Sequence, residues 1–205
     1  ALIEKRIAET KLDALLSQMN PHFTFNAMNT IQDFIISNDI DNSLLFISDL
    51  AKLMRLTLDN SAKKSITLEE EISFLKTYIK LENLRFGNRI SVSIELDKAV
   101  DYHTRIPVML LQPFVENVFV HAFNENHPNP QLNITFTMKS NELLECKIID
   151  NGNGKASFSK LKLHESKALK LAEERLKLIQ PEIENSIITD FTENDGSCVS
   201  IVLKV

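Results

Sequence analysis

The chain has 205 residues, of which 43% are hydrophobic and 25% are charged, and its formal net charge at pH 7 is -5. This length suits one large domain or two small ones, and the hydrophobic content is sufficient for a buried core. A net negative chain lacks the concentrated basic surface that nucleic acids and anionic lipids require, so neither is expected as a direct partner. No window approaches the roughly 18 consecutive apolar residues of a membrane-spanning helix.

The first part of the chain has a helical character. Glycine is absent before Gly87, and Pro21 is the one proline in that stretch. Such a composition favours long helices. The spacing of Ile47, Leu50 and Met54, continued by Leu58, predicts one apolar face on a helix of about 20 residues, and this face requires a partner helix.

A boundary is predicted at residues 61–65, where the sequence SAKKS is small, polar and basic. Thr67 and Glu70 directly after it have the spacing of a capping box, which predicts the start of a third helix that ends near Gly87. The sequence therefore predicts a helical domain over residues 1–62 and a second domain over residues 63–205.

The second domain alternates apolar and polar residues. This pattern predicts five strands, at residues 89–97, 131–138, 143–150, 185–192 and 197–205. Helices are predicted at residues 110–123 and 169–178. Strands with interspersed helices imply an α+β fold in which helices pack on one face of a sheet, a two-layer sandwich. Cys146 and Cys198 lie in apolar stretches without metal-site spacing, which predicts two reduced core residues and a reducing compartment.

The helix after Pro21 has two different sides when successive residues are turned by about 100°. The apolar side consists of Met28, Ile31 and Ile35. The polar side consists of His22, Asn26, Asn29 and Asp33. An accessible neutral imidazole is a competent nucleophile at cellular pH. On helical phase alone, a surface histidine that is simply solvated is the more common explanation of His22.

Two further segments carry polar groups in apolar surroundings. In residues 110–123 and just beyond, Asn117, His121 and Asn124 recur at i, i+4 and i+7, with Glu116 at the margin. Their oxygen atoms suit Mg²⁺, although a helix edge facing solvent would give the same pattern. The sequence IIDNGNG ends a predicted strand at Asp150, and its glycines suit either a backbone that passes close to a ligand or an ordinary hairpin turn.

Several segments resemble the LytS-like sensor histidine kinases. NPHFTFN (residues 20–26) is similar to the family's phosphoacceptor motif NPHFLFN, with Thr24 in place of an apolar residue. TLEEEISFLKTYIKLENLRFGNRI and IPVMLLQPFVENVFVHAF resemble the opening of the family's ATP-binding domain and its nucleotide-binding helix. IIDNGNG resembles the DxGxG box of the ATPase superfamily that histidine kinases share with gyrases.

The resemblance implies a role for each matching residue. It makes His22 the phosphoacceptor, Asn117 the Mg²⁺ ligand and Glu116 the residue that orients the metal or its water. It places His121 at the nucleotide and Asp150 at the adenine amino group. Gly152 and Gly154 would let the next loop approach ATP, and Ser197, after Gly196, would border the adenine pocket.

The resemblance also implies cofactors and partners. The cofactors are ATP and Mg²⁺, and the helical domain forms a homodimeric four-helix bundle. The phosphoryl group passes to an aspartate of a response regulator, expected to be of the LytTR type, and no nucleic acid is contacted directly. The chain is expected to be the cytoplasmic part of an inner-membrane protein whose sensor or transmembrane region precedes these residues.

The chain departs from the family pattern in the stretch after Gly154. Ser166 and Ala168 occupy positions of the family's glycines, and Leu171 occupies that of its asparagine. Val120 and Ala122 stand in place of the usual lysine and glycine around His121. Two interpretations follow: an active kinase that autophosphorylates on His22, or a degenerate kinase that serves as a dimerisation or docking module with weak or no ATP turnover.

Overall fold

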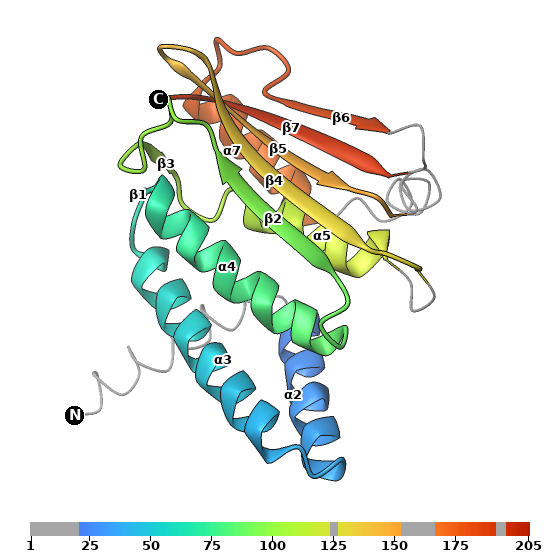
Figure 1. The fold of residues 1–205 in the computed structure, drawn as a ribbon. Helices are drawn as coiled ribbons and strands as arrows, with labels where there is room; N and C mark the ends of the chain where they lie inside the picture. Colours follow the sequence, from blue (N-terminus) through green and yellow to red (C-terminus); the bar gives the residue numbers. More distant parts are fainter. Residues whose placement is uncertain (1–20, 124–126, 153–166, 192–195) are drawn as a thin grey trace, which may run out of the picture.

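The computed structural model describes residues 21–123, 127–152, 167–191 and 196–205 of the chain. Its first two helices, α2 (Pro21–Ile36) and α3 (Ile40–Ser61), form a hairpin below the rest of the molecule (Figure 1). The connection between them is tight: Asn38 has a φ of 58°, and the Asp39 side chain caps α3 by accepting from the Asn42 amide at 3.3 Å.

The C-terminal part contains a five-stranded sheet with the order β2-β4-β5-β7-β6. Its strands are β2 (Ser91–Leu96), β4 (Gln131–Ser140), β5 (Leu143–Asp150), β6 (Ile187–Phe191) and β7 (Ser197–Lys204). The pair β2 and β4 is parallel, and every other neighbouring pair is antiparallel. The five strands lie where the alternation predicts them. A small antiparallel pair, β1 (Ser65–Thr67) and β3 (Arg105–Pro107), was not predicted.

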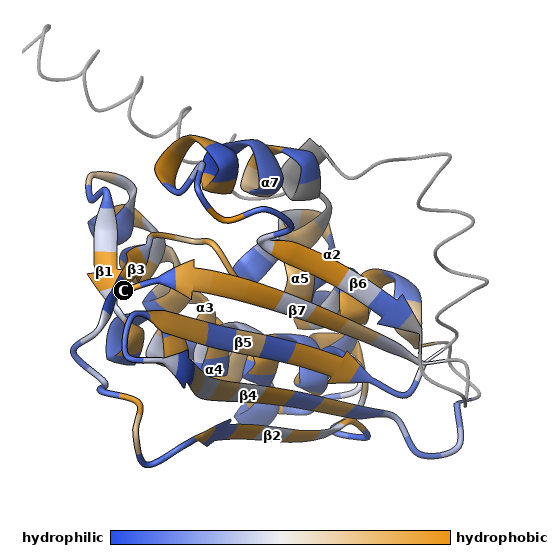
Figure 2. Ribbon diagram, turned by 90° about the horizontal axis from the view of Figure 1, so that it is seen from above, coloured by the Kyte–Doolittle hydropathy of each residue, from blue (hydrophilic) through white to orange (hydrophobic). Residues whose placement is uncertain are grey.

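Helices cover one face of this sheet. They are α4 (Leu68–Arg85), α5 (Gln112–Asn117), the π-helix η1 (Val118–Ala122) and α7 (Lys167–Ile179). Figure 2 looks onto the sheet, with α4 and α5 behind it. Burial alternates along β4, where Leu132, Ile134 and Phe136 are buried and their neighbours are partly exposed, as expected of a sheet with one covered face. The predicted α+β fold is confirmed.

Helix α4 begins at the predicted capping box. The Glu70 amide donates to the Thr67 hydroxyl at 3.2 Å, and the Thr67 amide donates to the Glu70 carboxylate at 2.9 Å. At the other end Gly87 has a φ of 66°, the left-handed conformation that terminates many helices. Both ends of this helix were therefore readable from the sequence.

The hairpin packs against α4 through a different face of α3 from the one the sequence singled out. The buried residues of α3 are Ser43, Phe46, Leu53, Thr57 and Asn60. The predicted face is turned away, because Ile47, Met54 and Leu58 are exposed and Leu50 is half-buried. No helix of the described part of the chain covers that face.

Helix α2 likewise buries a face that helical phase did not predict. Phe23, Ala27 and Thr30 are buried, whereas Met28 and Ile35 of the predicted apolar side are 66% and 64% exposed. The buried side chains of α2 and α3 belong to one hydrophobic cluster with those of α4 and the sheet. The division of the chain after residue 62 remains a prediction.

Two other sequence-based expectations concern cysteines and membranes. Cys146 is a buried free thiol and Cys198 is a free thiol that is only half-buried, so the core prediction is right for the first and wrong for the second. Among the described helices, none is both long and apolar enough to cross a bilayer.

Candidate nucleotide and phosphoacceptor site

Asp150 lies at the last position of β5 and is 3% exposed. One of its carboxylate oxygens accepts from the Gly152 amide at 2.8 Å, and the other accepts from the Ser197 hydroxyl. Ser197 faces Asp150 because the two residues are direct partners in the antiparallel pairing of β5 and β7. The sheet register thus brings together two predicted site residues that are far apart in sequence, and it fixes the orientation of a buried carboxylate.

Gly152 lies against the end of η1. A Cβ atom added to Gly152 would be 2.2 Å from the carbonyl oxygen of Ala122 and 2.6 Å from its carbonyl carbon. No side chain fits at that separation, so the backbone after Asp150 passes directly beside the helix that carries Asn117 and His121. The structure thereby brings the Asp150 segment and the predicted nucleotide helix together.

The predicted helix at residues 110–123 is shorter and less regular than expected. It starts at Gln112 as α5 and changes to π-helical geometry at Val118. Glu116 and Asn117 are half-buried, whereas His121 is exposed. Because a π-helix has more residues per turn, the i, i+4, i+7 stripe does not continue from Asn117 to His121 as predicted. Asn124 lies outside the described residues.

The loop after η1 is tied to the end of β5 by Asn151. Its side chain accepts from the Gln131 amide at 2.7 Å and donates to the Asn129 carbonyl at 2.7 Å. A ring nitrogen of His127, Nε2, lies 2.9 Å from the Asn151 carbonyl oxygen. Sequence analysis did not single out Asn151 or His127, although an Asn directly after Asp150 is a residue type that often bonds to nearby backbone.

A buried acidic residue of α4 forms a hydrogen bond at the start of α5. Glu71 is 0% exposed, and its Oε1 accepts from the Leu111 amide at 3.1 Å. Burial raises the pKa of Glu71 to about 7. The Leu111 and Met109 amides and the charge of Arg175 oppose this rise without cancelling it.

Arg175 of α7 supports the same turn. Its guanidinium donates to the Val108 carbonyl at 2.6 Å and to the Lys64 carbonyl at 3.3 Å. Sequence analysis missed both supports. A signal existed for Glu71, since it is a charged residue three positions after Leu68 and four before Leu75, on the apolar stripe of α4.

The remaining predicted residues are described in part or not at all. His22 belongs to α2, but its side chain lies outside the described part, as does that of Ala168 in α7. Gly154 and Ser166 lie outside the described residues altogether. Leu171 is 64% exposed on α7. The neighbour of His22, Phe23, is buried against Tyr78 of α4, with ring centroids 5.4 Å apart.

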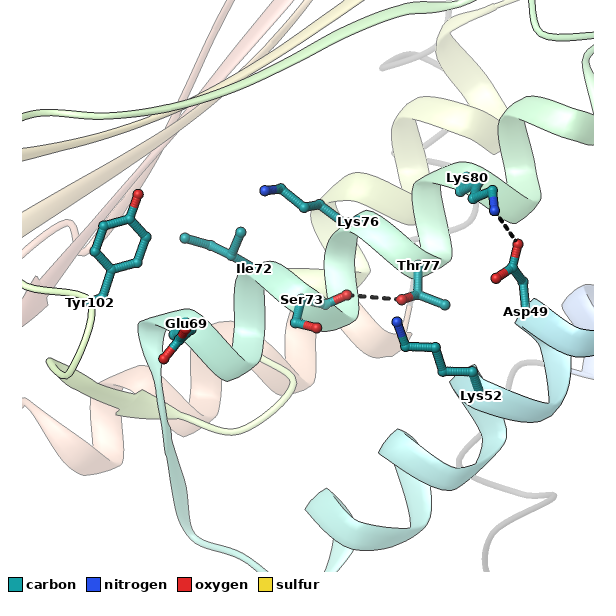
Figure 3. A pocket seen from close by; sticks show the side chains of 9 residues that line it. All are labelled: Asp49, Lys52, Glu69, Ile72, Ser73, Lys76, Thr77, Lys80 and Tyr102. Carbon is teal, nitrogen blue, oxygen red and sulfur yellow. Dashed lines mark hydrogen bonds and ion pairs between the residues drawn. The ribbon is translucent and has the colours of Figure 1, made fainter.

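A groove of about 420 Å³ lies elsewhere, between α3, α4 and the loop that carries Tyr102 (Figure 3). Lys52, Lys76 and Lys80 line it, and Lys80 forms a 2.6 Å ion pair with Asp49. None of the predicted site residues borders this groove. It is part of the contact between the hairpin and α4, not of the candidate nucleotide site.

Comparison with known proteins gives the family of the chain. Residues 10–90 match the sequence model of the histidine kinase family, described as "Histidine kinase". The LytS sensor protein of Enterococcus faecalis is 32% identical over 150 residues, which are 73% of this chain and 25% of that protein. This chain belongs to the LytS-like sensor histidine kinases.

A second relative of this histidine kinase matches it with similar identity and coverage. The LytS sensor protein of Staphylococcus saprophyticus is 32% identical over 148 residues, or 72% of this chain and 24% of that protein. The kinase chain thus spans about a quarter of the length of the curated relatives it matches. A solved structure described as a bacterial phosphotransferase has 14% identity and a TM-score of 0.52, and the match covers 92% of this chain and 94% of that one.

Proposed function

We propose that this chain is the kinase core of a two-component system, which autophosphorylates on His22 with Mg·ATP and passes the phosphoryl group to a response regulator. The observation that carries the proposal is the arrangement around Asp150. A buried carboxylate, fixed by Ser197 and the Gly152 amide, lies beside a backbone segment that only glycine allows against η1. A buried, oriented carboxylate at the end of a central strand suits the recognition of an adenine amino group.

In this proposal each predicted residue has one task. Asp150 accepts a hydrogen bond from the adenine amino group, and Ser197 holds that carboxylate in place. Asn117 provides a Mg²⁺ ligand, with Glu116 orienting the ion or its water, and His121 lies at the same helix end. Mg²⁺ takes only one or two protein ligands when nucleotide phosphates and water supply the others, so this small donor set fits the ion.

The transfer itself requires position and charge neutralisation more than covalent chemistry by the protein. The unprotonated imidazole nitrogen of His22 attacks the γ-phosphorus, and a P–N bond forms as the bond to the β,γ-bridging oxygen breaks. The electron pair of that bond leaves on ADP, and the imidazole proton is released to solvent. The phosphoramidate then transfers its phosphoryl group to an aspartate of the response regulator, proposed to be of the LytTR type.

The labelling experiment uses γ-labelled ATP with Mg²⁺ and tests for protein phosphate that is labile in acid and stable in alkali. Wild-type chain is expected to be labelled, and His22→Gln is expected to remain unlabelled. Equal labelling of His22→Gln would refute the assignment of the acceptor. If neither is labelled and millimolar Mg·ATP gives no thermal stabilisation, the degenerate-module interpretation replaces the kinase, in line with the lost glycines at Ser166 and Ala168.

We also propose that the kinase is a homodimer formed through α2 and α3. Both helices expose large apolar side chains, and on α3 Ile47, Met54 and Leu58 share a face that no described helix covers. The exposed apolar residues are Phe25, Met28, Ile35, Ile36, Ile40, Leu44, Leu45, Ile47, Met54 and Leu58. Exposed apolar side chains gathered on one helix face are a feature of protein interfaces.

The dimer is tested by introducing charge into this surface. Ile47→Glu with Met54→Glu is expected to convert a dimer into monomers in sedimentation equilibrium, because two carboxylates would be buried without partners. Ser48→Glu, on an exposed polar face of the same helix, is the matched control and is expected to remain dimeric. An unchanged mass for the double variant would place the interface elsewhere.

A further inference from the structure

The residue after His22 is packed into the C-terminal part of its own chain. Phe23 is 7% exposed and stacks on Tyr78 of α4, with ring planes 30° apart and centroids 5.4 Å apart. An offset stack of two buried rings fixes both the separation and the direction of the segments that carry them. The first turn of α2, which contains His22, is therefore seated on α4.

Tyr78 makes a second aromatic contact, to the predicted nucleotide helix. Its ring meets Phe119 of η1 edge to face, at 6.3 Å between centroids and 81° between planes. Phe119 is 1% exposed and follows Asn117 by two residues. One ring thus contacts both Phe23, the neighbour of His22, and η1, which directly follows the proposed Mg²⁺ ligand Asn117.

The environment of Tyr78 holds this ring in place. Tyr78 is 2% exposed, and burial raises the pKa of its phenol well above the usual range, with the negative charges of Glu82 and Glu116 acting in the same direction. The phenol therefore stays neutral throughout the working pH range. A neutral, buried ring that cannot ionise is a stable spacer between α2 and η1.

The rest of the hairpin is fixed to the same helix. Asp49 of α3 forms an ion pair with Lys80 at 2.6 Å (Figure 3). Leu53 of α3 is 2% exposed and belongs to the shared hydrophobic cluster. The Asp49 side chain is 19% exposed and that of Lys80 is 56% exposed, so solvent screens the pair in part, and the buried apolar contacts hold the two parts together. The exposed apolar face of α3 remains available to a second chain.

These contacts bear on whether His22 is phosphorylated from the nucleotide site of its own chain or from that of its partner. We propose that His22 receives the phosphoryl group from ATP bound to its own chain, and that Tyr78 is the positioning residue that holds the acceptor turn beside the nucleotide helix. The proposal rests on the kinase function proposed above. It makes the reaction intramolecular even within a dimer.

The test combines two inactive chains in one dimer. Chains carrying His22→Gln and Asn117→Ala, each with its own affinity tag, are co-expressed, and the mixed dimers are isolated through both tags in succession. Wild-type chain paired with His22→Gln is the positive control. Within-chain transfer predicts label in the control and none in the dimer of the two variants, because no chain there has both an intact site and an intact acceptor.

Each result has one meaning. Label on His22 of the Asn117→Ala chain would overturn the within-chain proposal and leave the kinase function standing. Absence of label from the wild-type chain would overturn the kinase function itself. Within-chain transfer also predicts a labelling rate per chain that is independent of wild-type concentration, and a rate that rises with concentration would contradict it.

The positioning role is tested separately by truncating the ring beside His22. Phe23→Ala is expected to lower the maximal labelling rate by about tenfold or more while the dissociation constant for ATP stays unchanged, because misplacement acts on the transfer step. Phe46→Ala is the matched control, since Phe46 is buried in the same cluster but packs on Phe34, 6.1 Å away, instead of Tyr78. Tyr78→Phe keeps the ring and is expected to keep the rate.

Two outcomes would contradict the positioning role. One is an equal loss of rate in Phe23→Ala and Phe46→Ala, which would report general destabilisation. The other is a rise in the dissociation constant for ATP that accounts for the whole loss in Phe23→Ala. The mixed-dimer experiment stands whether or not the truncated variants fold, because it uses neither of them.

Discussion

The buried carboxylate of Glu71 makes the stability of this kinase depend on pH in a direction opposite to that of most acidic groups. In the folded chain burial raises the pKa of Glu71 to about 7, against an ordinary value of 4.5. Below pH 4.5 the Glu71 carboxyl is protonated in both the folded and the unfolded chain, so it does not change the stability with pH. Between these two values the unfolded chain releases a proton that the folded chain retains, so stability falls as pH rises and is level again above about pH 7.

The size of the effect follows from the two pKa values of Glu71. Their separation corresponds to about 3 kcal/mol of folding free energy lost across the window, at about 1.4 kcal/mol for each pKa unit. Glu71→Gln removes the ionisable group and keeps an oxygen for the Leu111 amide, so it is expected to remove this slope. At pH 7.5 the variant is expected to be at least as stable as wild type.

The measurement is urea unfolding of wild type and Glu71→Gln at intervals from pH 4.5 to 7.5, followed by circular dichroism. The difference between the two unfolding free energies isolates Glu71 from other titrating groups. Glu69→Gln, at an exposed position of the same helix, controls for the loss of one carboxylate from α4. A difference that is flat with pH, or that favours wild type as pH rises, would refute the buried, protonated state of Glu71.

Two further predictions concern the nucleotide site. Gly152→Ala is expected to lower the unfolding free energy by about 1–3 kcal/mol, because its Cβ would overpack against the Ala122 carbonyl, and to abolish ATP binding in calorimetry. Gly87→Ala is the control, since the space around its Cβ is open, and it is expected to retain ATP binding. ATP binding by Gly152→Ala would contradict the close approach. Ser197→Ala removes a hydrogen-bond donor to the buried Asp150 carboxylate. This variant is expected to lose about 2 kcal/mol of unfolding free energy and to bind ATP more weakly. An unchanged dissociation constant for ATP would show that Ser197 does not orient Asp150.

Much of the fold was predictable because its signals are local. Alternation of residues gave the five strands of the sheet, and the capping box at Thr67 gave the start of α4, since each depends on neighbouring residues alone. The three-residue strands β1 and β3 were missed because so short a segment has no period. The π-helix at Val118 was missed because a change of hydrogen-bond register within a helix leaves no distinct local sequence pattern.

The candidate site was predictable only in its chemically distinctive residues. Asp150 and Ser197 could be proposed from motifs, but their contact depends on the register of two strands distant in sequence, which no local pattern gives. Tyr78 resembles an ordinary helix residue in the sequence, and Glu71 differs from one only by being a charged residue on the apolar stripe of α4. What distinguishes them is complete burial, and burial depends on the neighbours that the fold supplies.

Glu71 and Tyr78 connect α4 to the two segments that the proposed phosphoryl transfer would bring together. Seven residues separate them, so they lie on the same side of the helix and about 10 Å apart along its axis. Glu71 holds the start of α5 through the Leu111 amide, and Tyr78 contacts both Phe23 and η1. A movement of α4 would therefore shift the acceptor turn and the nucleotide helix together. Because the hairpin packs on this same helix, a displacement of the hairpin would, under the proposed function, act on both segments at once.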